Sequence, residues 1–309
     1  MNKFYMLVGL PGSGKSTIAQ KLNCKVFSSD SLRKELWGNE NAQGDNSQLF
    51  NELQRRIRET LKKGEDCVYD ATNINAKRRI SFLNSIKGIE CEKICIFVAT
   101  DFNLCLLRNF QRERHVPYEV IKRMYLNFDI PQFREGWNDI QIEVALDGNT
   151  HYDIVWLIEH LCDISHDTPH HTLSIGDHIK EVVKKVNYYS GFMRIEDSGR
   201  YNKLVLAAMH HDIGKEFCKT FQKPNGELDD IAHYYGHENV SAYMFIMYSS
   251  DMCTDIHDIL YIADLIALHM RLFVREEDQE KAYAKLKQLI GEKEFEDLCL
   301  LHKADIEGD

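Results

Sequence analysis

The sequence predicts two units in series: an α/β unit built on a doubly wound parallel sheet, followed by an all-α unit. Up to about residue 146, short apolar runs alternate with amphipathic segments of helix length. After the polar stretch 147–150 this alternation stops, and the chain continues as long helical segments broken by polar turns such as residues 223–226. A chain of 309 residues can form two cores of about 150 residues each, so we expect domains at 1–148 and 149–309.

The predicted elements of the first unit follow directly from this pattern. Five apolar runs are expected to be strands: residues 3–9, 25–28, 67–70, 93–99 and 140–146. Five amphipathic segments are expected to be helices: residues 16–22, 48–63, 76–86, 102–112 and 118–127. Because strands and helices alternate, the strands are expected to run parallel in one sheet.

Composition and charge indicate the location of the protein and the ligands that each unit can bind. No run reaches the roughly 18 apolar residues that a membrane span needs, so we expect a cytoplasmic protein that is neither secreted nor inserted. Nine cysteines, an odd number without a C-x-x-C pair, argue against a disulfide framework and a thiolate zinc site. The net charge of −10 divides into +3 for residues 1–150 and −13 for residues 151–309. The first unit can therefore approach a polyanion, and the second has carboxylates for metal binding or solubility.

A phosphate-binding loop is predicted at residues 9–16. They read Gly-Leu-Pro-Gly-Ser-Gly-Lys-Ser and fit G-x-x-x-x-G-K-[ST] between a predicted strand and a predicted helix. In such a loop backbone N–H groups curl around the phosphates, the lysine bridges the outer phosphates and the hydroxyl binds Mg²⁺. The expected phosphate-binding residues are Gly9, Gly12, Ser13, Gly14, Lys15, Ser16 and Thr17, with Ser16 as the Mg²⁺ ligand.

Two carboxylates follow predicted strands, at the sheet edge where open α/β sheets bind ligands. Asp30 could accept the proton of a hydroxyl group, or it could cap the next helix. Arg33, one turn on, favours the first role because a cation beside the base can hold an anionic acceptor. Asp70 could hold Mg²⁺ through water or orient Arg33. Asn73 is expected to cap the helix that follows it.

An arginine cluster follows the fourth predicted strand. Arg108 and Arg112 are expected to be i, i+4 neighbours on one helix face, with Arg114 close behind. A paired-arginine lid would neutralise a phosphoryl group during transfer. Solvated surface arginines are the alternative.

With these parts, residues 1 to about 146 resemble the 5′-hydroxyl polynucleotide kinases of bacterial and phage RNA-repair systems. The resemblance rests on the phosphate loop, the arginine lid, Ser-Asp-x-x-Arg at Asp30 and Arg33, Asp-Ala-Thr-Asn at Asp70, and Pro131-x-x-x-Glu135-Gly136. It implies ATP as donor, Asp30 as general base, Arg33 as contact to the acceptor phosphate, and Arg108 with Arg112 as lid. P-loop kinases of small molecules and toxin-type kinases share the loop and the first aspartate, so the resemblance indicates the reaction more specifically than the substrate.

Histidines are concentrated in the second half: only His115 precedes residue 150, and thirteen follow it. Six histidines and aspartates, two of them adjacent, recur at intervals of about one helix, so helix packing could bring them into one pocket. These candidate metal ligands are His178, the pair His211 and Asp212, His237, His269 and Asp305. Imidazole with carboxylate suits Mn²⁺, Ni²⁺, Co²⁺, Fe²⁺ or Zn²⁺, and such a site can bind a phosphoester and activate water. Any one of these histidines alone could equally be a surface or core residue.

The stretch 207–215, an apolar helix ending in His-Asp-Ile-Gly-Lys, resembles the signature of the HD-superfamily phosphohydrolases. The resemblance spans roughly residues 155–309. It implies that His178, His211, Asp212 and Asp305 bind a metal, that His237 and His269 match second-metal positions, and that Lys215 contacts substrate phosphate. The neighbouring histidines 170, 171, 210 and 233 are possible misassignments, and the number of metals stays open.

Together the two resemblances predict a bifunctional enzyme that heals nucleic-acid ends. The kinase, a phosphotransferase to an alcohol group, would phosphorylate a 5′-OH with ATP and Mg²⁺. The HD domain would remove a 2′-, 3′- or 2′,3′-cyclic phosphate, preparing nucleic-acid ends, with RNA favoured over DNA, for a ligase. Two alternatives stay open: a kinase and nucleotidase of small molecules or free nucleotides, and a nucleotide-sensing regulator without turnover.

Overall fold

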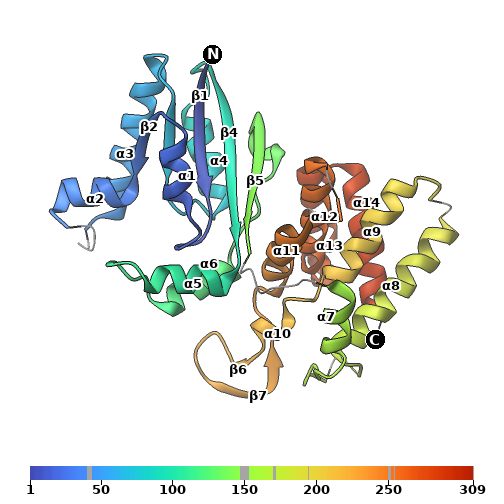
Figure 1. Ribbon diagram of the computed structural model, residues 1–309. Coiled ribbons are helices and arrows are strands. Elements are labelled where there is room, and N and C mark those ends of the chain that lie inside the picture. The colour runs from blue at the N-terminus through green and yellow to red at the C-terminus, as the bar shows by residue number, and fades with distance from the viewer. Residues whose placement is uncertain are drawn as a thin grey trace. The chain divides into compact units, whose positions relative to one another are not determined.

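The computed structural model describes residues 1–39, 44–146, 153–169, 172–193, 195–249, 252–253 and 255–308 (Figure 1). The chain separates into two compact units, Met1–Asn149 and Thr150–Asp309. The predicted domain boundary, between residues 148 and 149, lies outside the described residues. Each unit is described by itself.

The first unit contains the predicted parallel sheet. Its strands are β1 (Asn2–Val8), β2 (Lys25–Ser28), β3 (Cys67–Asp70), β4 (Cys91–Thr100) and β5 (Asp139–Ala145). They lie in the order β2-β3-β1-β4-β5, and every neighbouring pair is parallel. Asp70 is in register with Leu7 of β1 and with Ser28 of β2. The segments that follow β1, β2 and β3 therefore begin at the same edge of the sheet.

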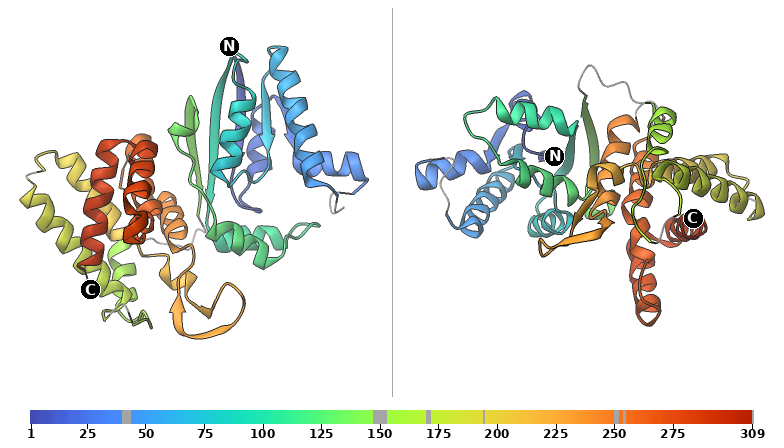
Figure 2. Two further views of the ribbon diagram at one scale, coloured as in Figure 1. Left: turned by 180° about the vertical axis from the view of Figure 1, so that it is seen from behind. Right: turned by 90° about the horizontal axis from the view of Figure 1, so that it is seen from below.

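Helices cover both faces of this sheet, which confirms the doubly wound α/β class. They are α1 (Lys15–Lys21), α2 (Ser29–Trp37), α3 (Asn46–Lys62), α4 (Ala76–Ser85), α5 (Phe102–Phe110) and α6 (Tyr118–Leu126). Ala19 of α1 packs with Leu7 on one face. On the other face, Phe82 of α4 lies 5.2 Å from Phe4 between ring centres. Figure 1 accordingly shows α1 in front of the sheet, and the view from behind in Figure 2 brings α4 to the front.

The second unit is largely helical. Its helices are α7 (Ile154–Leu161), α8 (Ile175–Phe192), α9 (Ser198–His210), α10 (Lys215–Cys218), α11 (His237–Tyr248), α12 (Ile256–Leu268), η3 (His269–Leu272), α13 (Glu276–Ile290) and α14 (Glu292–Ile306). Ile158 of α7 and Ile179 of α8 belong to one buried cluster. A Cβ on Gly176 would lie 2.3 Å from the carbonyl oxygen of Ile158, so only glycine permits this close approach. That packing fixes the start of α8, from which His178 projects.

The second unit also contains a short β-hairpin that was not predicted. Thr220–Gln222 (β6) and Leu228–His233 (β7) form an antiparallel hairpin, visible below α10 in Figure 1. The predicted turn at residues 223–226 is present, with Gly226 at φ +88°. The N–H of Gly226 donates to the carbonyl oxygen of Lys223 at 2.9 Å, and the left-handed conformation of Gly226 lets the chain enter the second strand of the hairpin. Among the described residues, no helix has the length and apolar character required to cross a membrane.

Candidate active sites in the two units

The loop between β1 and α1 has the geometry of a phosphate cradle. Gly12 and Gly14 have φ values of +85° and +100°, which side chains on L-residues rarely adopt. A Cβ on Gly12 would also lie 2.2 Å from the carbonyl oxygen of Cys105. The N–H of Gly9 donates to the carbonyl oxygen of Thr72 at 3.0 Å, which ties the loop to the segment after β3. Because glycine has no side chain, an anion can reach the backbone N–H groups at the start of α1.

Lys15 is buried within this loop. Its Nζ donates to the carbonyl oxygens of Gly9 (3.0 Å) and Leu10 (2.7 Å) and to Ser13 Oγ (3.3 Å). Burial lowers the pKa of Lys15 to about 8, although the nearby Asp70 opposes the shift. A triphosphate beside the loop would stabilise the charged form of this lysine.

Asp70 pairs with Ser16 rather than with Arg33. Ser16 Oγ donates to Asp70 Oδ2 at 2.9 Å. Burial raises the pKa of Asp70, and Lys15 and Ser16 oppose that change. A hydroxyl oxygen and a carboxylate at this distance are the hard oxygen ligands that Mg²⁺ prefers, so the pair fits the predicted Mg²⁺ site. Thr17, another of the expected phosphate-binding residues, lies within α1.

Asp30 lies in the first turn of α2 but does not cap it. Ser28 is the N-cap residue, and its Oγ accepts from the N–H of Asp30 at 3.2 Å. The carboxylate of Asp30 is therefore available for other contacts, and its Oδ1 accepts from Arg33 at 3.1 Å and from Arg114. With 51% of its side chain exposed, Asp30 can still be reached by an acceptor hydroxyl.

The arginine segment differs from the prediction. Arg108 Nη1 donates to the carbonyl oxygen of Ser13 in the phosphate loop at 3.3 Å. Helix α5 ends at Phe110, so Arg112 lies beyond it and is not an i, i+4 neighbour on the same helix. The helix ends because the buried side chain of Asn109 bonds both to the carbonyl oxygen (2.9 Å) and to the N–H (3.0 Å) of Val116, which closes residues 110–116 into a loop.

Three further residues of the first unit have structural roles. Asn75, not Asn73, caps α4, because its side chain accepts from the N–H of Arg78 at 3.1 Å. Asn73 instead donates to the carbonyl oxygen of Leu7 at 2.8 Å. Glu135 accepts from the buried guanidinium of Arg79 at 2.6 and 2.7 Å, so it holds α4 to the segment that leads into β5.

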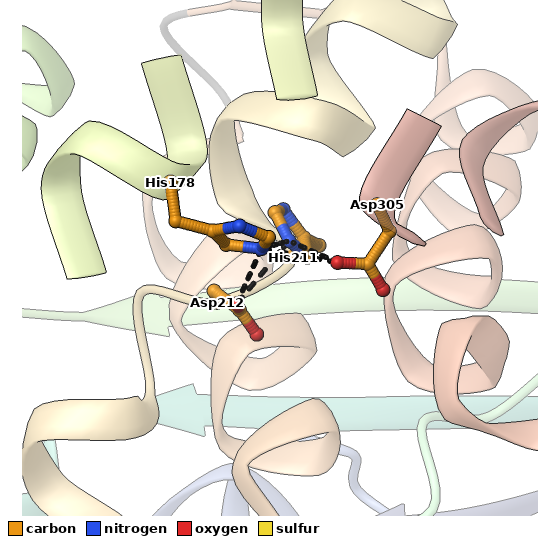
Figure 3. Close-up of side chains that lie close together, drawn as sticks. All are labelled: His178, His211, Asp212 and Asp305. Carbon is orange, nitrogen blue, oxygen red and sulfur yellow. Dashed lines mark hydrogen bonds and ion pairs between the residues drawn. The ribbon is translucent and has the colours of Figure 1, made fainter. Parts of the chain in front are cut away.

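In the second unit the predicted ligands meet in one buried cluster (Figure 3). His178, His211, Asp212 and Asp305 offer ligand atoms that all lie within 4.8 Å of one another. The atom pairs are His178 Nε2 to Asp305 Oδ1 (3.0 Å) and to Asp212 Oδ2 (3.4 Å), and His211 Nε2 to Asp212 Oδ2 (3.3 Å). They come from α8, from the C-terminal end of α9 and from α14.

A second group shares Asp212. His237 Nε2 lies 3.2 Å and His269 Nε2 3.7 Å from Asp212 Oδ1. His237 begins α11, and His269 follows α12 directly. The two oxygens of Asp212 therefore face two different ligand groups, an arrangement that can bridge two cations.

Hydrogen bonding prepares these histidines to bind a cation. The Nδ1 atoms of His211, His237 and His269 lie 2.7–2.8 Å from backbone carbonyl oxygens, which only accept. Each Nδ1 therefore carries the proton, and each Nε2 presents a lone pair. Nε2 of His237 lies 3.3 Å from Nε2 of His269, and one carboxylate oxygen, Oδ1 of Asp212, faces both. Lone pairs at such distances repel unless positive charge lies among them, so the donor set fits a divalent transition metal.

The charges of the cluster agree with this interpretation. Burial raises the pKa of Asp212, but His211 and Lys215 outweigh burial and hold it well below its usual range. For His211, burial lowers the pKa, yet Asp212 and Asp305 raise it to about 9 without a metal, so a cation bound at its Nε2 would displace a proton from that atom. Burial and the neighbouring His237 lower the pKa of His269 to about 3. The carboxylates of the site are thus ionised, and their negative charge favours the binding of a cation.

The other histidines are separated from this cluster. His210 packs against Phe245 with ring centres 5.1 Å apart, and His233 pairs with Asp229 at 3.0 Å. Residues 170 and 171 lie outside the described residues. One buried histidine beside the cluster was not predicted: His166 lies 3.1 Å from Nζ of Lys215. No motif surrounds it, so only the packing of the chain identifies it.

The fold and the phosphate loop define the first unit as a P-loop kinase domain. Residues 4–131 match the model of an AAA domain family, AAA_33. An L-seryl-tRNA(Sec) kinase of Methanococcus maripaludis is 29% identical over 156 residues, which cover 45% of this chain. The chain spans 58% of the length of that relative.

Two solved structures match part of the chain at low TM-scores. A gluconokinase from Sinorhizobium meliloti is 18% identical, with a TM-score of 0.32 over 45% of this chain and 81% of that one. A chain of a Pnkp1/Rnl/Hen1 complex is 19% identical, with a TM-score of 0.31 over 38% of this chain and 41% of that one.

Proposed function

We propose that this chain is a bifunctional enzyme that heals nucleic-acid ends, RNA ends in preference to DNA ends. The P-loop unit would transfer the γ-phosphate of ATP to a 5′-hydroxyl group. The helical unit would hydrolyse a terminal 2′-, 3′- or 2′,3′-cyclic phosphate. The observation that carries the proposal is the presence of both a phosphate loop with an arginine-flanked carboxylate and a buried cluster centred on Asp212.

The roles in the kinase follow from the contacts of Asp30. Its carboxylate takes the proton of the acceptor hydroxyl while the hydroxyl oxygen attacks the γ-phosphorus, and the bond to the β,γ-bridging oxygen of ATP breaks. Arg33 would hold the phosphate that follows the first nucleoside of a polynucleotide. Lys15, Arg108 and Arg112 supply positive charge to the group in transfer, and Ser16 with Asp70 would hold Mg²⁺.

In the helical unit, His178, His211, Asp212 and Asp305 would hold one divalent ion, and Asp212, His237 and His269 a second. Such ions supply Lewis-acid activation of a phosphoester and of water. Lys215 Nζ lies 2.7 Å from Asp212 Oδ2 and would bind a non-bridging phosphate oxygen beside the cluster. The pKa values of Asp212 and Asp305 lie well below their usual range, so both carboxylates stay ionised for this role.

An acceptor series tests the kinase. Purified protein, Mg²⁺ and γ-labelled ATP are supplied with a nucleoside, a dinucleotide and longer RNA or DNA with 5′-OH ends. We expect kcat/KM to rise at least about 10-fold from nucleoside to dinucleotide, because only the dinucleotide offers Arg33 a charged hydrogen-bond partner. Seryl-tRNA belongs in the series, since the name of the Methanococcus relative gives a tRNA-borne acceptor. Transfer to the free nucleoside as fast as to the oligonucleotides would contradict a polynucleotide acceptor.

Separate variants test the independence of the two sites. Lys15→Ala and Asp30→Asn should abolish phosphorylation and spare hydrolysis of oligonucleotides that end in 2′-, 3′- or cyclic phosphate. Asp212→Asn should do the reverse with Mn²⁺, Ni²⁺, Co²⁺, Fe²⁺ or Zn²⁺ supplied. Loss of both activities in every variant would show damage to the fold instead of two separate sites.

A further inference from the structure

His166 makes contacts that give it a specific place beside the proposed hydrolase site. The residue is 1% exposed. Its Nδ1 lies 2.8 Å from the carbonyl oxygen of Leu173, and its Nε2 lies 3.1 Å from Nζ of Lys215. Its own carbonyl oxygen accepts from the hydroxyl of Tyr234. These contacts fix both the backbone and the ring of His166.

The bonding pattern determines the tautomer of His166. A carbonyl oxygen only accepts, so Nδ1 carries a proton. The lysine ammonium only donates, so Nε2 must offer its lone pair to Lys215. His166 is thus a neutral acceptor, and a protonated ring would place two cations 3.1 Å apart.

The position of Lys215 follows from its two acceptors. Its Nζ lies 2.7 Å from Asp212 Oδ2 and 3.1 Å from His166 Nε2. The ring centre of Tyr234 is 5.6 Å from Nζ, which adds a cation–π attraction but no acceptor atom. An ammonium group has three N–H bonds in tetrahedral directions. With two directions taken by Asp212 and His166, the direction of the third N–H is fixed.

We infer that His166 is a positioning residue that aims the third N–H of Lys215 at an oxygen of the substrate phosphate. This inference rests on the proposed hydrolase function. The property that matters is that His166 accepts a hydrogen bond without carrying a negative charge. A carboxylate in place of the imidazole would also orient the lysine, but it would cancel the charge that attracts a phosphate dianion. The imidazole orients Lys215 and leaves that charge in place.

Three substitutions separate orientation from charge. His166→Gln keeps a neutral acceptor near the position of Nε2, His166→Glu places a charged acceptor there, and His166→Leu removes the acceptor. The exposed His257→Leu, in the first turn of α12, is the matched control. Each full-length variant is loaded with Mn²⁺ and assayed on RNA that ends in a 3′-phosphate. Bound metal is measured by elemental analysis, folding by circular dichroism, and the affinity for inorganic phosphate by calorimetry.

We expect His166→Leu and His166→Glu to weaken phosphate binding and kcat/KM by about 10- to 100-fold, the effect of losing one charged hydrogen bond. Metal content should be unchanged, His166→Gln should retain most of both functions, and His257→Leu should match the unaltered protein. Equal impairment of the Gln and Leu variants, unimpaired Leu, or loss of metal in proportion to activity would each overturn the inference. If the unaltered protein hydrolyses no phosphoester, the proposed function fails, and the phosphate affinities still decide the role of His166.

Discussion

Arg114 donates a hydrogen bond to Oδ1 of Asp30, a residue 84 positions earlier in the chain. Arg33 donates to the same oxygen at 3.1 Å. Two guanidinium groups, one from α2 and one from the loop after α5, therefore hold a single carboxylate oxygen. In the proposed kinase reaction the other oxygen, Oδ2, would take the proton of the acceptor hydroxyl.

This relationship predicts the effect of removing Arg114. Arg114→Ala should lower kcat for phosphorylation by about 100-fold, because a misplaced base loses its alignment with the acceptor hydroxyl. Hydrolysis by the second unit should be unchanged. The exposed Arg123→Ala on α6 is the control for loss of one positive charge. Equal rates for the Arg114 and Arg123 variants in a single-turnover assay would exclude this role.

Lys15 predicts a pH dependence of ATP binding. Since burial lowers its pKa to about 8, the free protein loses the charge of Lys15 as the pH rises through that value. The triphosphate favours the charged form, so binding above pH 8 should take up a proton and affinity should fall. Calorimetry in buffers of different ionisation enthalpy measures that proton. Lys15→Arg stays charged in this range, so its affinity should be independent of pH between about 7.5 and 9.5.

Gly12 predicts a stability difference between two alanine substitutions. Gly64→Ala meets no atom within 4 Å and should cost only the about 1–2 kcal/mol of a left-handed backbone conformation. Gly12→Ala adds an overlap with the carbonyl oxygen of Cys105 and should lower the free energy of unfolding by at least about 1–3 kcal/mol more. Hydrogen exchange in urea, measured on peptides of β1 and β4, checks the order. Equal effects would refute the steric argument.

The shared carboxylate of Asp212 predicts the metal stoichiometry. Elemental analysis should find two divalent ions per chain, one after His269→Ala, and none after Asp212→Ala. Chelation should lower the melting temperature of the helical unit, because a ligand that binds only the folded state stabilises it. Two ions retained by His269→Ala, or a melting temperature insensitive to chelation, would contradict the two-ion arrangement.

Local patterns in the sequence were sufficient to predict much of the fold of this protein. Apolar runs that alternate with amphipathic segments predicted the parallel sheet, since strands buried on both faces read as nearly continuous apolar runs. The phosphate loop was readable because backbone curvature requires glycine at fixed offsets. The strands of the hairpin at residues 220–233 were missed because they are short and half exposed, and a three-residue strand has no detectable period.

The amino-acid sequence alone determined which chemical groups are available and roughly where the sheet edge and the helix ends fall, because those depend on neighbours in the chain. Tertiary structure alone decided which groups touch. The side chain of Asn109 ends α5 before Arg112. Arg114 is a second arginine partner for Asp30, and the two oxygens of Asp212 face different ligands. Tertiary structure also brought His166 to Lys215, 49 residues away. Such contacts depend on how helices distant in sequence pack, and no local pattern encodes that packing.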